Sequence, residues 1–125
     1  VNHMSDGAFK LMKKITPGPY TFIFKASKLI PKIAITNQKT IGVRIPDNNI
    51  ALELVKQLDR PILSASVSNK EGEYVIDPED LEKELRHKVD LVISAGPKIS
   101  DPSTIIDFTS GEAEVIREGK GSIFL

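Results

Sequence analysis

The amino-acid sequence predicts an α/β domain with a mixed, twisted β-sheet. Short segments rich in β-branched and aromatic residues, such as YTFIFKA (20–26), recur along the chain. Amphipathic segments with helical periodicity, such as DNNIALELVKQL (47–58), lie between them. Breakers such as TPGP (16–19) separate the two kinds of segment. The length suits one domain, which we place at residues 5–125.

Three segments are expected to form helices because each combines a capping residue with a helical pattern. In residues 5–14, Ser5 or Asp6 can cap the start, and two lysines suit the negative C-terminal end. Residues 47–58 can be capped by Asp47 or Asn48. They carry an apolar stripe at helical spacing, made of Ile50, Leu54 and Leu58 or of Ala51, Leu54, Val55 and Leu58. Residues 77–85 (DPEDLEKEL) begin with a capping aspartate and a proline. KLIPKI (28–33) predicts a turn or a short helix.

Six segments are expected to be strands. In the first, Tyr20, Phe22 and Phe24 share one face. In the second, Arg44 lies on the face opposite Val43 and its apolar neighbours. The predicted strands are YTFIFKA (20–26), TIGVRIP (40–46), PILSASV (61–67), VDLVISAG (89–96), STIIDFT (103–109) and AEVIREG (113–119).

Composition excludes several kinds of chemistry. The chain has no cysteine, which rules out disulfides and thiolate metal sites and fits a cytoplasmic protein. The two histidines, His3 and His87, are far apart in sequence, so no metal site or Ser-His-Asp triad is expected. The phosphate-binding loop GxxxxGK[ST], the dinucleotide motif GxGxxG and the zinc motif HExxH are absent. No apolar run approaches the roughly 20 residues of a membrane helix.

The net charge of zero hides a division along the chain. Residues 1–45 carry eight lysines and arginines against one acid, and residues 46–125 carry nine against sixteen. Such a division predicts a basic face that attracts phosphates or nucleic acid. The alternative is a solvated surface whose two halves neutralise each other, and the lack of aromatic residues among the lysines favours it.

Hydroxyl and guanidinium groups gather at the predicted strand ends. Planar guanidinium groups beside hydroxyls suit the recognition of a phosphate or a carboxylate. The alternative is that these side chains satisfy strand edges and turns and that the arginines pair with nearby acids. The candidates are Thr40, Arg44, Ser64, Ser66, Ser103, Thr104 and Arg117.

The order of the segments resembles the YrdC–YciO family, which includes the threonylcarbamoyl-AMP synthases. The resemblance covers about residues 5–120, and PSTIIDFT resembles the YciO branch more than the synthases. The segments that carry it are TPGPYTFIFKASKLIPK, KTIGVRIPDNNIALELVKQL, PILSASVS, PSTIIDFT and VIREGKG.

This resemblance implies a twisted α/β fold, here a partial domain, with a concave basic surface. Synthases of the family bind ATP with Mg²⁺, L-threonine and bicarbonate and make the precursor of a modified adenosine in tRNA. The family is also linked to tRNA and double-stranded RNA. By resemblance, the nucleotide would contact Thr40, Ser66, Ser68 and Arg117, and L-threonine would contact Arg44, Ser64 and Ser103.

Two departures from the family pattern shape the expected function. Ser68 stands where the family has an asparagine, and Asn69 follows one position later. The Lys-x-Arg motif that the family places well before its Pro-Gly-Pro block is absent. We therefore expect a C-terminal portion that is inactive alone and that covers exposed strand edges by dimerising. The alternatives are half of a genuine synthase, or a non-catalytic interaction domain on the same fold.

Overall fold

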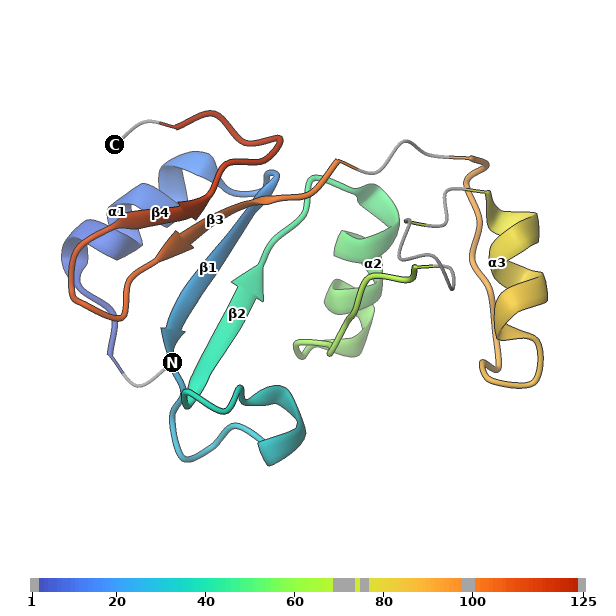
Figure 1. The fold of residues 1–125 in the computed structure, drawn as a ribbon, viewed down its shortest axis with the longest axis horizontal. Helices are drawn as coiled ribbons and strands as arrows, with labels where there is room; N and C mark the ends of the chain where they lie inside the picture. The colour runs from blue at the N-terminus through green and yellow to red at the C-terminus, as the bar shows by residue number, and fades with distance from the viewer. Residues whose placement is uncertain (1–2, 69–73, 75–76, 98–100, 124–125) are drawn as a thin grey trace. The chain divides into compact units, whose positions relative to one another are not determined.

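The computed structural model describes residues 3–68, 74, 77–97 and 101–123 (Figure 1). The chain divides into two compact units. The first comprises Val1–Ile62 and Pro102–Leu125, and the second comprises Leu63–Asp101. The first unit contains the four-stranded sheet, and each unit is described by itself below.

The sheet is mixed, as the sequence predicts. Its strands are β1 (Tyr20–Lys25), β2 (Thr40–Arg44), β3 (Thr104–Asp107) and β4 (Glu114–Arg117), in the order β2-β1-β3-β4. The central pair, β1 and β3, is parallel, and the other two pairs are antiparallel. Tyr20 lies opposite Thr104, so the parallel pairing joins segments that are far apart in the sequence.

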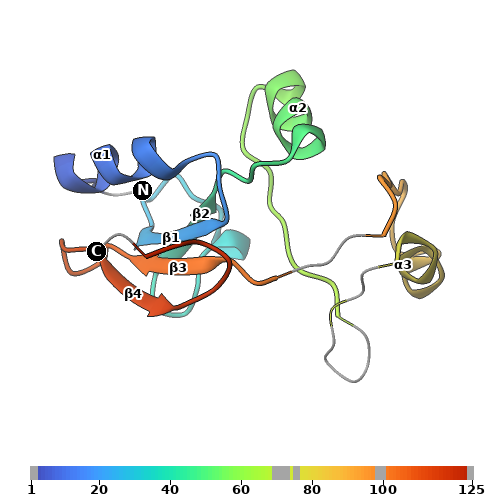
Figure 2. The same cartoon turned by 90° about the horizontal axis from the view of Figure 1, so that it is seen from above.

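One face of the sheet forms the core. Helix α1 (Asp6–Ile15) covers this face, as Figure 2 shows from above. The α1 residues Ala8 and Met12 are buried with Phe22 and Phe24, whose side chains are 0% and 1% exposed. Phe108 stacks on both phenylalanine rings, with centroids 6.1 Å and 5.3 Å away. The alternating pattern of YTFIFKA therefore places its aromatic residues as predicted.

The predicted helices are confirmed. Ser5 caps α1 by accepting a hydrogen bond from the Ala8 amide, at 3.1 Å. Helix α2 (Asn49–Leu58) is capped by Asn48, and α3 (Pro78–Leu85) by Asp77. The KLIPKI region contains a short 3-10 helix, η1 (Lys32–Ala34). No helix in the described part of the chain is long and apolar enough to cross a membrane.

Two predicted strands are wrong. Residues 61–67 and 89–96 have no regular secondary structure. Ser68, just after the first segment, forms an isolated bridge with Tyr74. A strand needs a hydrogen-bonded neighbour as well as apolar residues. Within the described residues neither segment has one, and Leu63 and Leu91 are 65% and 76% exposed.

The apolar stripe of α2 is exposed rather than packed. Ile50, Leu54 and Leu58 are 37%, 44% and 48% exposed, and no residue of the helix is buried. The stripe was predicted from helical spacing. Such spacing indicates an amphipathic helix, but it does not identify the surface against which the apolar face packs. Dimerisation through exposed strand edges or apolar faces stays a prediction.

Candidate functional site

The face of the sheet opposite α1 carries polar side chains, and we call it the open face. Residues that alternate with the buried aromatics point to it, beginning with Thr21 in β1. Strand pairing places Arg44 opposite Thr21, Thr21 opposite Ile105, and Ile105 opposite Arg117. One row of residues therefore crosses all four strands with an arginine at each end. At an interstrand spacing of about 4.8 Å, the two arginine Cα atoms lie about 14 Å apart.

Ser103 lies next to this row, immediately before β3. Its hydroxyl oxygen is 2.7 Å from that of Thr21, and the residue is 6% exposed. Arg117 donates to the Ser103 carbonyl oxygen through Nε at 3.1 Å and Nη2 at 2.8 Å. The Nη2 atom also lies 3.3 Å from the Ser103 hydroxyl. We call Thr21, Ser103 and Arg117 the hydroxyl–guanidinium cluster.

The segment Gly119–Ser122, which we call the strap, is hydrogen-bonded to the first residues of β1 and β3, Tyr20 and Thr104. The buried Thr104 hydroxyl accepts from the Gly119 amide at 3.0 Å and donates to the Gly121 carbonyl at 2.7 Å. The Tyr20 hydroxyl donates to the Ser122 carbonyl at 2.9 Å. A Cβ atom at Gly121 would strike the Tyr20 ring, so the close approach of the strap requires glycine there.

Thr40 opens β2 at the end of a tight turn. Its hydroxyl is 2.7 Å from the Thr36 hydroxyl, and its amide donates to the same Thr36 oxygen at 3.2 Å. Lys39, just before it, has a positive φ of 58°. The turn thus fixes Thr40, which pairs with Lys25 across the sheet.

Four of the seven residues predicted to bind ligands lie in one unit of the structure. Thr40, Arg44, Ser103 and Arg117 all belong to the sheet unit, and the last two are in direct contact. The remaining three, Ser64, Ser66 and Ser68, belong to the other unit and are exposed. Ser64 and Ser66 were predicted on one face of a strand, which is wrong because no strand forms there. Asn69 lies outside the described residues.

Sequence reasoning missed Thr21 and Thr36. Both are threonines in ordinary local contexts, one within a strand and one within a loop. Thr21 had one available signal, because it alternates with the core residues Tyr20 and Phe22 and therefore faces away from them. Its partner Ser103 is 82 positions later, and sequence spacing alone does not indicate that contact.

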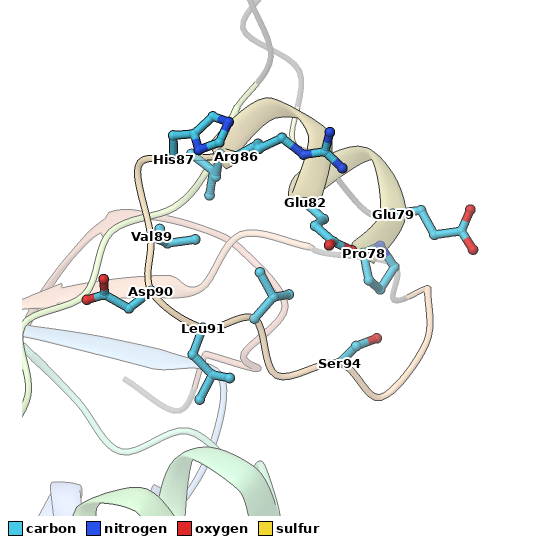
Figure 3. A pocket seen from close by; sticks show the side chains of 11 residues that line it. Pro78, Glu79, Glu82, Arg86, His87, Val89, Asp90, Leu91 and Ser94 are labelled. Carbon is cyan, nitrogen blue, oxygen red and sulfur yellow. The ribbon is translucent and has the colours of Figure 1, made fainter.

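The second unit contains a hollow of about 430 Å³ between α3 and the segment that follows it (Figure 3). Its lining includes Arg86 and His87 beside the acids Glu79, Glu82 and Asp90. Acidic groups outnumber the arginine, which disfavours a phosphate or carboxylate ligand. None of the residues predicted from sequence to bind ligands lines it.

Comparison with known proteins decides the family. The family model described as telomere recombination (Sua5–YciO–YrdC) matches residues 1–119. The chain belongs to this family. The open face, whose strands all lie within the matched residues, is therefore part of a Sua5–YciO–YrdC domain.

Three relatives of this Sua5–YciO–YrdC chain illustrate the range of the family. It is similar to the crystal structure of Escherichia coli YciO, with a TM-score of 0.87, 40% identity and coverage of 98% of this chain and 61% of that one. Pyrococcus abyssi threonylcarbamoyl-AMP synthase is 30% identical over 91% of this chain and 34% of its own. Pyrococcus abyssi Sua5 complexed with L-threonine has a TM-score of 0.79 at 29% identity, covering 94% and 35%.

The chain spans only part of its relatives. It covers 59% of a Haemophilus influenzae relative and 57% of E. coli YciO in sequence. The predicted α/β fold and family are confirmed by these likenesses. The activity, substrates and partners of a whole protein are taken up as proposals below.

Proposed function

We propose that the open face binds L-threonine and ATP and that, in a whole protein, it serves the synthesis of threonylcarbamoyl-AMP. The observation that carries this proposal is the row across the sheet, with Arg44 at one end and the Ser103–Arg117 contact at the other. Two cationic side chains, one of them held by hydrogen bonds to Ser103, suit a ligand pair that brings a carboxylate and phosphates. The L-threonine complex of the P. abyssi relative supports the choice of amino acid.

Each side chain has a role that its position supports. Arg44 is exposed on β2, and its guanidinium would pair with the L-threonine carboxylate. Arg117 would face the nucleotide phosphates, and the Ser103 hydroxyl would lie between the two ligands. Thr40 would add a hydroxyl contact to the nucleotide. By family resemblance alone, Ser64, Ser66 and Ser68 of the other unit stay candidate ligand contacts, and bicarbonate would be the third substrate.

Magnesium would enter as part of the nucleotide. Among the residues that the structure describes, no group of three or more histidine, cysteine or acidic side chains is placed to hold a metal ion. Mg²⁺ is commonly held by substrate phosphates with few protein ligands. By alternation the open face also carries Asp107 of β3 and Glu114 of β4, which lie opposite each other. The cationic and hydroxyl groups of the proposed site lie toward the other ends of these two strands, at Ser103 and Arg117.

Calorimetric titration tests the proposed ligands. We expect L-threonine and Mg²⁺-ATP each to bind the chain with measurable heat, and L-threonine to bind better than L-valine, which lacks the hydroxyl. L-Valine and inorganic phosphate are the matched controls. The absence of binding by both proposed ligands at millimolar concentration would contradict the proposal.

RNA is a second candidate partner, favoured by the basic N-terminal part of the chain. Lys25, Lys28, Lys32 and Lys39 are exposed around η1 and the neighbouring strand ends. Phosphate contacts release counterions, so affinity for duplex RNA should fall steeply as salt rises. A filter-binding series at about 50 and 200 mM salt should show a loss of at least tenfold. Affinity that does not change with salt would count against these lysines as the contact.

A further inference from the structure

Thr21 is the one member of the hydroxyl–guanidinium cluster that neither the sequence nor the comparisons single out. Its two γ substituents point in different directions. The methyl group is oriented toward Gly42 of β2, where a Cβ would lie 3.4 Å from it. The hydroxyl is oriented toward β3, where it lies 2.7 Å from the Ser103 hydroxyl. Only the hydroxyl therefore connects this residue to the candidate site.

The Ser103 hydroxyl is contacted by both Thr21 and Arg117. A serine hydroxyl has one donor and two acceptor positions, and it rotates freely unless a partner fixes it. The Ser103 hydroxyl has partners on two sides, Thr21 and the Arg117 Nη2 atom. When the Ser103 hydroxyl donates to Thr21, its rotation is fixed and an oxygen lone pair stays available to the Arg117 Nη2 atom.

Arg117 keeps some of its N–H donors free of the contacts to Ser103. A guanidinium has five N–H donors. The contacts to Ser103 use Nε and Nη2, and they hold the plane of the group from one side. Among the described residues, no hydrogen bond involves the two Nη1 donors. They form an oriented pair that suits an anionic oxygen.

We propose that Thr21 is a positioning residue, which acts through Ser103 to orient Arg117 toward an anionic ligand group. This inference rests on the proposed function for its ligand, the phosphates of ATP. Preorganisation of a side chain raises affinity because the ordering cost is met before the ligand arrives. Loss of the Thr21 hydroxyl should therefore weaken binding without removing any atom that touches the ligand.

Two substitutions separate the hydroxyl from the methyl group. Thr21→Val keeps the shape and β-branching but removes the hydroxyl, and Thr21→Ser keeps the hydroxyl but removes the methyl. By calorimetry with Mg²⁺-ATP, we expect Thr21→Val to bind about tenfold more weakly and Thr21→Ser within about twofold of the parent. In thermal unfolding the order should reverse, with Thr21→Ser the less stable variant, because serine suits a strand less well.

A ligand-free measurement keeps the inference separate from the proposed function. The Nε–H of Arg117, assigned by its loss in Arg117→Lys, should exchange slowly with solvent in the parent and in Thr21→Ser. It should exchange several-fold faster in Thr21→Val. Equal exchange in all three proteins, or equal ATP affinity of the two variants, would overturn the inference. If the parent binds no ATP but exchange is still several-fold faster in Thr21→Val than in the parent and in Thr21→Ser, Thr21 remains the positioning residue and only the ATP site is rejected.

Discussion

Replacing Arg44 with glutamine is expected to weaken L-threonine binding by about ten- to a hundredfold. Arg44 stands at one end of the row across the open face, and its exposed guanidinium is free of the core. Hydrogen bonds to charged groups contribute about 1.5–3 kcal/mol, which corresponds to this range of affinity. Glutamine retains length and polarity but loses the charge and the planar fork. Calorimetric titration with L-threonine measures the effect.

Two control variants show whether the effect belongs to this position. Arg44→Lys retains the charge without the fork, so its affinity should fall between those of the parent and Arg44→Gln. Arg60→Gln removes the same charge from an exposed arginine just beyond α2, which is not part of the row across the open face, and should leave binding within about twofold of the parent. If Arg44→Gln behaves like Arg60→Gln, Arg44 does not hold the carboxylate.

Replacing Thr104 with valine is expected to lower the free energy of unfolding by about 2–4 kcal/mol. The side chain is 0% exposed, and its hydroxyl joins the Gly119 amide to the Gly121 carbonyl. Valine has nearly the same shape but leaves both backbone groups without this partner. An unsatisfied buried polar group costs about 1–3 kcal/mol. Urea unfolding followed by circular dichroism measures the loss.

The matched control is Thr104→Ser, which retains the hydroxyl and removes one methyl group. Its loss should be about 1 kcal/mol, the cost of a small deletion in a packed core. The strap should also become more accessible to protease in the valine variant, since Thr104 holds it to the start of β3. Equal stability of the two variants would show that the hydroxyl does not hold the strap.

Local sequence patterns predicted most of the secondary structure. The cap at Ser5, the alternation of Tyr20, Phe22 and Phe24, and the spacing within α2 are each read from neighbours within a few residues. Such patterns are reliable for a helix, because its backbone hydrogen bonds form within the element itself. For a strand they are reliable only when a neighbouring strand is present to accept and donate those hydrogen bonds. Residues 61–67 and 89–96 have strand composition, yet within the described chain no neighbour pairs with them.

The candidate site was predicted only in part. Arg44, Thr40, Ser103 and Arg117 were recognised as side chains that suit an anionic ligand, and the family supplied their roles. Thr21 was missed because its importance comes from a contact with Ser103, 82 positions away. The parallel pairing of β1 with β3 creates that contact. Pairing between strands distant in sequence depends on the packing of the whole sheet.

The sequence by itself determined the class of the fold, the family, and the face of β2 on which Arg44 lies. Alternation depends only on neighbouring residues, and the order of the segments can be read along the chain without knowing which of them touch. The tertiary structure decided which of these side chains meet. It joined Ser103 to Arg117 and Thr21 through the sheet, and it held the strap on Thr104. The physical reason is that a hydrogen bond between distant residues forms only after the strands that carry them have packed against a common core.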